Sequence, residues 1–503
     1  MSKSSIYSTF RCWVISAGLV LLLGARSLAA DHPGMQPTRP GPNVLLICVD
    51  DLRCELGCYG VNGIQTPNLD RLAAESRRFE RHYVQVAACG PSRCTLLTGR
   101  RENRSWDVWG AERKLTAAPA QPVSFADLFR RHGYRTASIG KVSHQPGGTM
   151  PSEYAVHQVP FSWDVATGPT GTWRNPWRAF FAYAGGKAYN RVIREVKNET
   201  PRLPYESADV DDDGYADGLT AQLAIDQLRD LTKRDEPFLL AVGFFKPHLP
   251  FNAPKKYWDL YDRDKIPAAP WPKPPRNLTT PLPLHDSYEP TSHYHWPGGK
   301  GNVSHDEGRS LKHGYWAAVS YVDAQIGKLL DEYRRLGLEE DTIVVLWSDH
   351  GWQLGDYGIW GKFTNYEWAL RSPLMIRAPG MAQPGKAARG IVETIDVYPT
   401  LADLCGLAAP ADLPGVSIRP LVEDPNRTGK NGAMSTVSRG GHFGRTLRTD
   451  RYRLVQWENV KTRKTVLVEL YDHETDPLET ENVALERPEV VERLLTQSHL
   501  NRN

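Results

Sequence analysis

Asn43 to Val49 (NVLLICV) is a nearly continuous apolar run that ends directly at Asp50 and Asp51. A short run of this kind is typical of a strand that is buried on both faces, as in a parallel sheet between two layers of helices. Similar runs alternate with amphipathic stretches along the chain. We therefore predict an α/β fold in which helices flank a large, mostly parallel sheet, with further strands at 136–139, 238–244, 342–347 and 373–377.

Helices are predicted where apolar residues recur with helical spacing, at 66–72, 123–131, 219–231, 311–336 and 397–404. The stretches 167–209 and 250–297 are rich in Pro, Gly, Trp and Tyr and lack periodicity. We expect them to form long loops over one face of the sheet, where specificity usually resides.

The character of the sequence changes after about residue 425. Alternating segments at 445–457 and 465–470 are followed by a helical pattern near Val490. This pattern predicts a small C-terminal α+β subdomain at 426–503, next to a catalytic domain at 42–425.

The charge of the chain is almost balanced. The 503 residues include 61 Lys and Arg against 58 Asp and Glu, a formal net charge of +3. This balance excludes the strongly basic field expected of a nucleic-acid-binding protein, so any anion must be recognised locally.

The first residues have the pattern of an export signal. Lys3 and Arg11 precede an apolar run at 13–23, and Ala29 ends a small-x-small cleavage site. The alternative is a single membrane anchor, but the run is about half the roughly 20 residues that a spanning helix needs. We therefore expect residues 1–29 to be a signal peptide of an exported protein (periplasmic, secreted or lumenal), without stable membrane insertion.

A second apolar run, TIVVLWS, ends at Asp349 and His350 in the same way as the first run ends at Asp50 and Asp51. Ligands of open α/β sheets bind beyond the carboxyl ends of the strands, so the two pairs could meet there. Three carboxylates would repel one another unless a cation lay between them, and such ligands favour Ca²⁺ or Mg²⁺. The alternative is that Asp50 and Asp51 only cap a turn.

The segment CGPSRCTLLTGR begins at Cys89 and contains Arg93. If Cys89 begins a helix, free backbone N–H groups and the guanidinium could attract an anion. Its thiol could then be a nucleophile with a lowered pKa, or simply a buried structural cysteine. The segment resembles the sulfatase signature, C-x-P-S-R followed by L-T-G-R.

The resemblance to sulfatases implies that Cys89 is oxidised to formylglycine by a formylglycine-generating enzyme. In that family, one hydroxyl of the hydrated aldehyde attacks the sulfur, and the other then expels sulfate by reforming the aldehyde. Cys89 would be both the nucleophile precursor and a metal ligand, and Arg93 would hold the formylglycine.

The same resemblance suggests roles for other residues. It implies calcium ligands at Asp50, Asp51, Asp349 and His350. Lys141 and Lys362 would bind the sulfate, His144 would act as the base, and His248 would protonate the leaving oxygen. Such cations would offset the negative charge that develops on the sulfuryl and leaving oxygens.

Within the sulfatases, the sequence is most similar to the iduronate-2-sulfatase group. SDHGW at 348–352 and GKVSH at 140–144 carry much of this similarity. It implies that Trp352 and His248 line a sugar pocket, and that the substrate is a sulfated oligo- or polysaccharide with a 2-O-sulfate on iduronate or a related uronic acid. The spacing of the cysteines does not reproduce the disulfides of the lysosomal animal enzyme.

Two other functions stay open. One is a phosphate or phosphonate ester hydrolase of the same superfamily, and the other is a sulfated-glycan binding protein without turnover, if Cys89 is not converted. A further motif, DVDDDG at 209–214, resembles the start of an EF-hand, but position twelve is Thr220 instead of Glu. We interpret it as structural.

Overall fold

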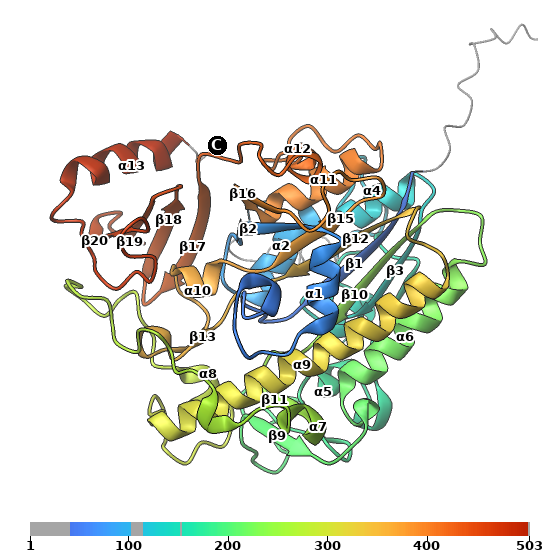
Figure 1. Ribbon diagram of the computed structural model, residues 1–503, viewed down its shortest axis with the longest axis horizontal. Coiled ribbons are helices and arrows are strands. Elements are labelled where there is room, and N and C mark those ends of the chain that lie inside the picture. The colour runs from blue at the N-terminus through green and yellow to red at the C-terminus, as the bar shows by residue number, and fades with distance from the viewer. Residues whose placement is uncertain (1–40, 102–113, 151–152, 501–503) are drawn as a thin grey trace, which may run out of the picture. The chain divides into compact units, whose positions relative to one another are not determined.

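An eight-stranded sheet between two layers of helices forms the centre of the protein (Figure 1). This computed structural model describes residues 41–101, 114–150 and 153–500, so the predicted signal peptide lies outside the described residues. Only one described strand of the sheet runs antiparallel to both neighbours, so the predicted mostly parallel sheet is confirmed. In spatial order the strands are β16 (Ala387–Glu393), β2 (Arg77–Tyr83), the antiparallel β15 (Leu374–Arg377), β12 (Thr342–Ser348), β1 (Asn43–Val49), β10 (Phe238–Phe244), β3 (Arg135–Gly140) and β6 (Val165–Thr167).

Strand β1 lies in the middle of the sheet, where both of its faces are covered. Leu45 and Ile47 pack into one hydrophobic core, and Leu46 and Cys48 into the other. Val49 is level with the last residues of β10 and β12, so the loops that follow all three strands leave from the same edge.

The helices lie on both faces of the sheet. One layer is formed by α1 (Pro67–Ala74), α6 (Ala216–Leu231) and α9 (His305–Arg335). The opposite layer is formed by α2 (Cys89–Thr98), α4 (Phe125–Arg131), α11 (Val397–Leu404) and α12 (Arg419–Glu423). The N-terminus of α9 is fixed by a capping box of Ser304 and Glu307, six residues before the predicted start.

The two stretches predicted as long loops contain short regular elements, so that prediction is wrong in part. Strands β9 and β11 pair in parallel, and α9 packs against both. The short elements of these stretches are α5 (Pro176–Phe180), β7 (Ala182–Tyr183), β8 (Lys187–Ala188), β9 (Tyr205–Ala208), β11 (Phe251–Pro254), α7 (Lys255–Trp258) and α8 (Tyr288–His293).

The predicted C-terminal subdomain is confirmed as a small antiparallel sheet with a helix against it. Its strands follow the order of the chain, and the predicted segment 445–457 is split between two of them by a turn. The boundary at residue 425 stays a prediction. The elements are β17 (Ala433–Arg439), β18 (His442–Arg448), β19 (Tyr452–Asn459), β20 (Thr465–Asp472) and α13 (Pro488–Leu500).

The short strands and α-helix not yet given lie between the main elements, and they are β4 (Thr149–Met150), β5 (Glu153–His157), β13 (Gln353–Leu354), β14 (Trp360–Gly361) and α10 (Glu367–Leu370). In the described ranges, no helix combines the length and apolar character needed to cross a membrane.

The EF-hand-like segment contributes Asp212 to ion pairs with Lys256, at 2.8 Å, and Lys328, at 2.6 Å. Two ammonium groups therefore neutralise this carboxylate.

Candidate active site

The carboxyl ends of β1 and β12 bring four predicted site residues together. Asp51 has a left-handed backbone, with φ 59°, and its N–H donates to Oδ1 of Asp349 over 3.0 Å. The N–H of Asp349 in turn donates to the carbonyl of Val49, the last residue of β1. These two bonds connect the strand ends directly, so Asp50 and Asp51 reach the same place as Asp349 and His350.

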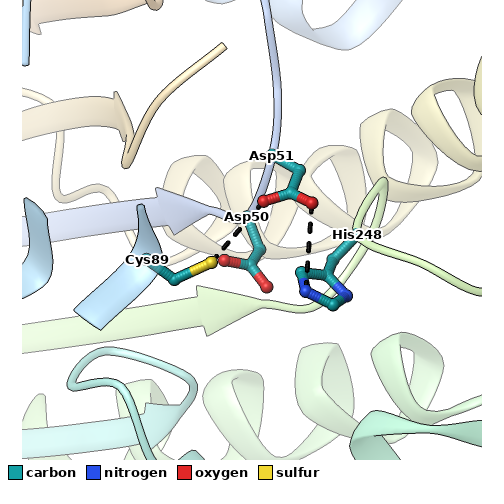
Figure 2. A group of neighbouring side chains, drawn as sticks. All are labelled: Asp50, Asp51, Cys89 and His248. Atoms are coloured by element: carbon teal, nitrogen blue, oxygen red, sulfur yellow. Dashed lines mark hydrogen bonds and ion pairs between the residues drawn. The ribbon is translucent and has the colours of Figure 1, made fainter. Parts of the chain in front are cut away.

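Cys89 is the first residue of α2, and its side chain points toward Asp50 and Asp51 (Figure 2). Its Sγ lies 3.3 Å from Nε2 of His350, 3.6 Å from Oδ1 of Asp51 and 3.4 Å from Nζ of Lys362. Ala88 at the N-cap has no polar side chain to cap the first turn of α2. The N-terminal N–H groups of the helix therefore add partial positive charge close to Cys89.

The five predicted metal ligands lie in two overlapping groups of buried donor atoms. Within each group, all donor atoms lie within 4.8 Å of one another. Burial raises the pKa of Asp349 to about 7, and the neighbouring Asp50 adds to this effect. Burial likewise raises the pKa of Asp51. Carboxylates packed in this way fit a hard divalent cation, which would offset their repulsion. The first group consists of Asp51, Cys89, Asp349 and His350. The second group consists of Asp50, Asp51, Cys89 and His248.

Arg93 and Lys141 neutralise the carboxylates from the other side. Nε of Arg93 lies 2.9 Å from Asp349, and its Nη2 lies 3.0 Å from Asp50. Nη1 donates to the carbonyls of Lys141 and Val142, at the end of β3. Burial acts to raise the pKa of Asp50, but Lys141 and Arg93 outweigh it and hold that pKa well below its usual value. Arg93 therefore joins three strand ends in one buried network.

His248 follows β10 in the loop Lys246-Pro247-His248. Its Nδ1 lies 2.6 Å from the carbonyl of Leu249, so Nδ1–H donates there and Nε2 faces Asp51 at 3.9 Å (Figure 2). Burial lowers the pKa of His248, and Lys362 and Lys141 add to this. Nε2 is therefore the ring nitrogen that is directed at the site.

His144 also lies within electrostatic range of the site. Burial and the nearby Lys141 lower its pKa to about 3.

Lys362 approaches from a turn that is held at three backbone positions. Its Nζ lies 3.0 Å from Oδ1 of Asp51. His285 bonds to the carbonyl of Lys362 over 2.6 Å, and the N–H of Phe363 donates to the carbonyl of Ala87 over 3.1 Å. Arg439, from β17 of the C-terminal subdomain, donates to the carbonyl of Phe363. These contacts fix Phe363 in a left-handed backbone, with φ 60°, which costs of order 1–3 kcal/mol in a non-glycine residue.

Glu289 is a site residue that sequence reasoning missed. It lies on α8 and is 7% exposed, with Oε1 3.3 Å from Nζ of Lys362 and 3.7 Å from Nε2 of His248. Its Oε2 has no hydrogen-bond partner among the described residues. No motif marks this glutamate, because it lies in a stretch without periodicity, and only the folded path of that stretch brings it to the site.

Trp352 lies beneath the site, not on an open surface. It is fully buried, with Nζ of Lys362 5.0 Å from the centre of its ring and Phe251 packed edge-on against it. Its Nε1–H has no partner in the described part of the chain. The predicted contact between Trp352 and a sugar stays a prediction, as do the functional roles predicted for the other site residues.

Comparisons with known proteins agree on one family. The family model described as Sulfatase matches residues 42–407, and a model described as N-sulphoglucosamine sulphohydrolase, C-terminal, matches residues 355–501. The chain is 31% identical to iduronate 2-sulfatase of Mus musculus over 439 residues, covering 78% of this chain and 74% of that protein. It is 29% identical to a sulfatase of Formosa agariphila, covering 92% of this chain and 88% of the relative.

Among solved structures, the phosphonate monoester hydrolase of Agrobacterium radiobacter superposes with a TM-score of 0.72 at 23% identity. The match covers 92% of this chain and 96% of that one. At this identity, the superposition supports the fold alone.

Proposed function

The chain belongs to the sulfatase family of sulfuric ester hydrolases, and from this premise we propose that it is an exported, calcium-dependent enzyme that removes sulfate from a sulfated glycan. The proposed substrate carries a 2-O-sulfate on iduronate or a related uronic acid. The observation that carries the proposal is the position of Cys89, whose Sγ lies among the carboxylates, the imidazole of His350 and Lys362. The similarity to iduronate 2-sulfatase supports the choice of substrate.

Two groups would complete the site. A calcium ion held by Asp50, Asp51, Asp349 and His350 would supply positive charge next to the sulfate oxygens. Formylglycine, made from Cys89 by a formylglycine-generating enzyme, would supply the nucleophilic hydroxyl. Both groups fit the buried, oxygen-rich donor set around Cys89.

The cationic side chains would bind the sulfate group, through Lys141 and Lys362, and hold the formylglycine, through Arg93. Lys362 lies 3.4 Å from the sulfur of Cys89, and Lys141 and Arg93 approach from the side of β3. All three are buried, so their charges act in a medium of low dielectric constant. They would stabilise negative charge where it develops during cleavage of the ester.

The two histidines would move protons. Because the carbonyl of Leu249 holds Nδ1–H of His248, the imidazolium form would donate its second proton, on Nε2, to the leaving oxygen. We propose His144 as the base, since burial and Lys141 favour its neutral form.

Replacing His248 with alanine is expected to have an effect that depends on the leaving group. An alkyl sugar oxygen needs a proton, so kcat/KM for a sulfated disaccharide should fall by about 10²–10³-fold. A nitrophenolate leaves without a proton, so the rate with nitrophenyl sulfate should fall far less. Steady-state kinetics with both substrates checks this, with His305→Ala at the exposed start of α9 as the control. Equal losses for both substrates would mean that His248 only positions the sugar.

Removal of calcium is expected to inactivate the enzyme and to lower its Tm. Without a cation, Asp51 and Asp349 are buried carboxyls whose raised pKa values mean that their charged forms are disfavoured. A ligand that binds only the folded state stabilises it by about 2.7 kcal/mol when its concentration is 100 times its Kd. Sulfate release and thermal unfolding in excess chelator, then with calcium restored, measure both effects. Unchanged activity and Tm in chelator would remove the proposed metal role of these residues.

The function itself is tested with a panel of defined sulfated disaccharides, using protein whose conversion at Cys89 has been checked by mass spectrometry. Sulfate release confined to 2-O-sulfated uronates would support the proposal in full. Release from other sulfated sugars alone would keep the chemistry and reject the substrate.

The second candidate is the one that the sequence left open, hydrolysis of phosphate or phosphonate esters. Comparing sulfate release with phosphate and phosphonate turnover decides between the two reactions. Binding of sulfated glycans without turnover by fully converted protein would instead favour a binding function.

A further inference from the structure

A concave site lies away from the active site, at the edge of the sheet formed by β16. It is a groove of about 1220 Å³ between β16, the segment 425–431, the turn at 449–452 and α13. Strand β16 is four positions from β1 in the sheet, which corresponds to roughly 19 Å at about 4.8 Å per strand. The groove is therefore separate from the cluster around Cys89.

The groove is lined with cationic side chains. Asp450 is the one acidic residue in its described lining. The chain as a whole has a net charge of only +3, so the accumulation is local. The six cations are Arg81, Arg389, Arg427, Lys430, Arg451 and Arg493.

Three of these cations form ion pairs with nearby carboxylates and are part of the wall of the groove. Arg81 lies 2.7 Å from Asp450, and its Nε donates to the carbonyl of Arg389. Lys430 contacts two buried carboxylates, and Arg451 is paired with Asp472 at 2.7 Å. Their charges are thus largely compensated.

Arg389 and Arg493 differ from the other cations. Both are exposed, and among the described residues neither makes an ion pair. Arg427 is also exposed, and its contact with Asp424 is a long 3.7 Å. These guanidinium groups are free to bind an anion from solution.

The backbone beside Arg389 departs from regular strand pairing. The pairing of β16 with β2 is interrupted between Ala388 and Ile391, and such bulges re-aim side chains. A Cβ on Gly390 would lie 2.8 Å from Cα of Gly429, so the segment 425–431 packs directly on the edge strand. The N–H of Lys430 donates to the carbonyl of Ile391 over 2.9 Å, which fixes this contact.

We propose that this groove binds an anionic segment of a polysaccharide, at a distance from the sulfate ester that reacts. Guanidinium groups bind sulfate and carboxylate oxygens in a bidentate manner. Asn426, Asn431 and Gln497 in the lining offer amide groups for sugar hydroxyls. The choice of a sugar chain over other anions rests on the proposed function.

The first test measures binding alone, in full-length protein that carries Cys89→Ala and does not turn over. The groove variant is Arg389→Gln with Arg493→Gln. The control is Lys461→Gln with Lys464→Gln, which removes two charges from the exposed turn between β19 and β20. With heparin as the probe, Kd should rise about tenfold in the groove variant, as expected for two partly exposed charge contacts, and stay nearly constant in the control.

Three results would overturn the proposal. An equal rise of Kd in both variants would show a general effect of charge, and an unchanged Kd in the groove variant would show that heparin binds elsewhere. An equal loss of affinity for duplex DNA in the groove variant would show a site for any polyanion.

The second test uses the converted active enzyme. The groove variant should turn over a short sulfated disaccharide like the unmodified protein, while KM for the sulfated polymer rises about tenfold. A KM for the polymer that does not change would overturn the link between the groove and the substrate. Failure of the proposed function appears differently, as no sulfate release from any glycan, and it leaves the binding test with heparin intact.

Discussion

Replacing Cys89 with alanine is expected to lower kcat by at least about 10³-fold, because loss of a nucleophile leaves only the binding and electrostatic contributions of the site. The fold should persist, since the change removes one sulfur atom from the start of α2 and none of the ion pairs that hold the strand ends. Sulfate release measures the first effect, and thermal unfolding measures the second.

Cys405→Ala is the matched control for this substitution. Cys405 is exposed to the same extent as Cys89, 6%, but it lies near Pro42 and Tyr134, outside the site. It should keep its activity. Sulfate release by Cys89→Ala at the rate of the unmodified protein would overturn the formylglycine proposal.

Arg93→Ala is expected to destabilise the protein strongly and to abolish turnover. The guanidinium is fully buried and contacts both Asp50 and Asp349, and breaking a buried pair by removing one partner typically costs about 3–5 kcal/mol. Loss of the bonds to the carbonyls of Lys141 and Val142 should also release the end of β3. Urea unfolding measures the free energy, and sulfate release measures the activity.

Arg100→Ala provides the comparison for Arg93→Ala. Arg100 lies just beyond the same helix and forms an exposed ion pair with Asp412 at 2.8 Å, a type of contact that contributes about 0–1 kcal/mol. An equally small effect for Arg93→Ala would contradict the structural role described for Arg93.

The central strands could be predicted because both of their faces are buried, so most of their positions carry an apolar residue. Strands β2 and β16 could not be predicted. β2 lies between β16 and β15, but its sequence, RRFERHY, is mostly polar, and β16 at the edge of the sheet is interrupted by Arg389 and Gly390. Arg77 of β2 is fully buried nonetheless, since its guanidinium donates to backbone carbonyls, including those of Val422 and Ala382. Nothing local in the sequence identifies those acceptors.

The same contrast holds for the site. Asp50 and Asp349 could be predicted to converge because parallel strands end at one edge, and Cys89 lies in a distinctive motif. Glu289 and Arg439 reach the site from segments whose path depends on packing far along the chain. A single sequence carries no pattern that specifies such paths.

The contact between Arg439 and the turn around Lys362 has a consequence for biosynthesis. Residues from near Cys89, from the central stretch and from the C-terminal sheet all hold this turn, so it closes only after the ribosome has delivered β17. A nascent or prematurely terminated chain that stops before Arg439 would contain every residue proposed for catalysis. It would still lack the contact from Arg439 that holds the turn around Lys362. Nonsense or frameshift mutations late in the gene should therefore give inactive protein and not partially active protein.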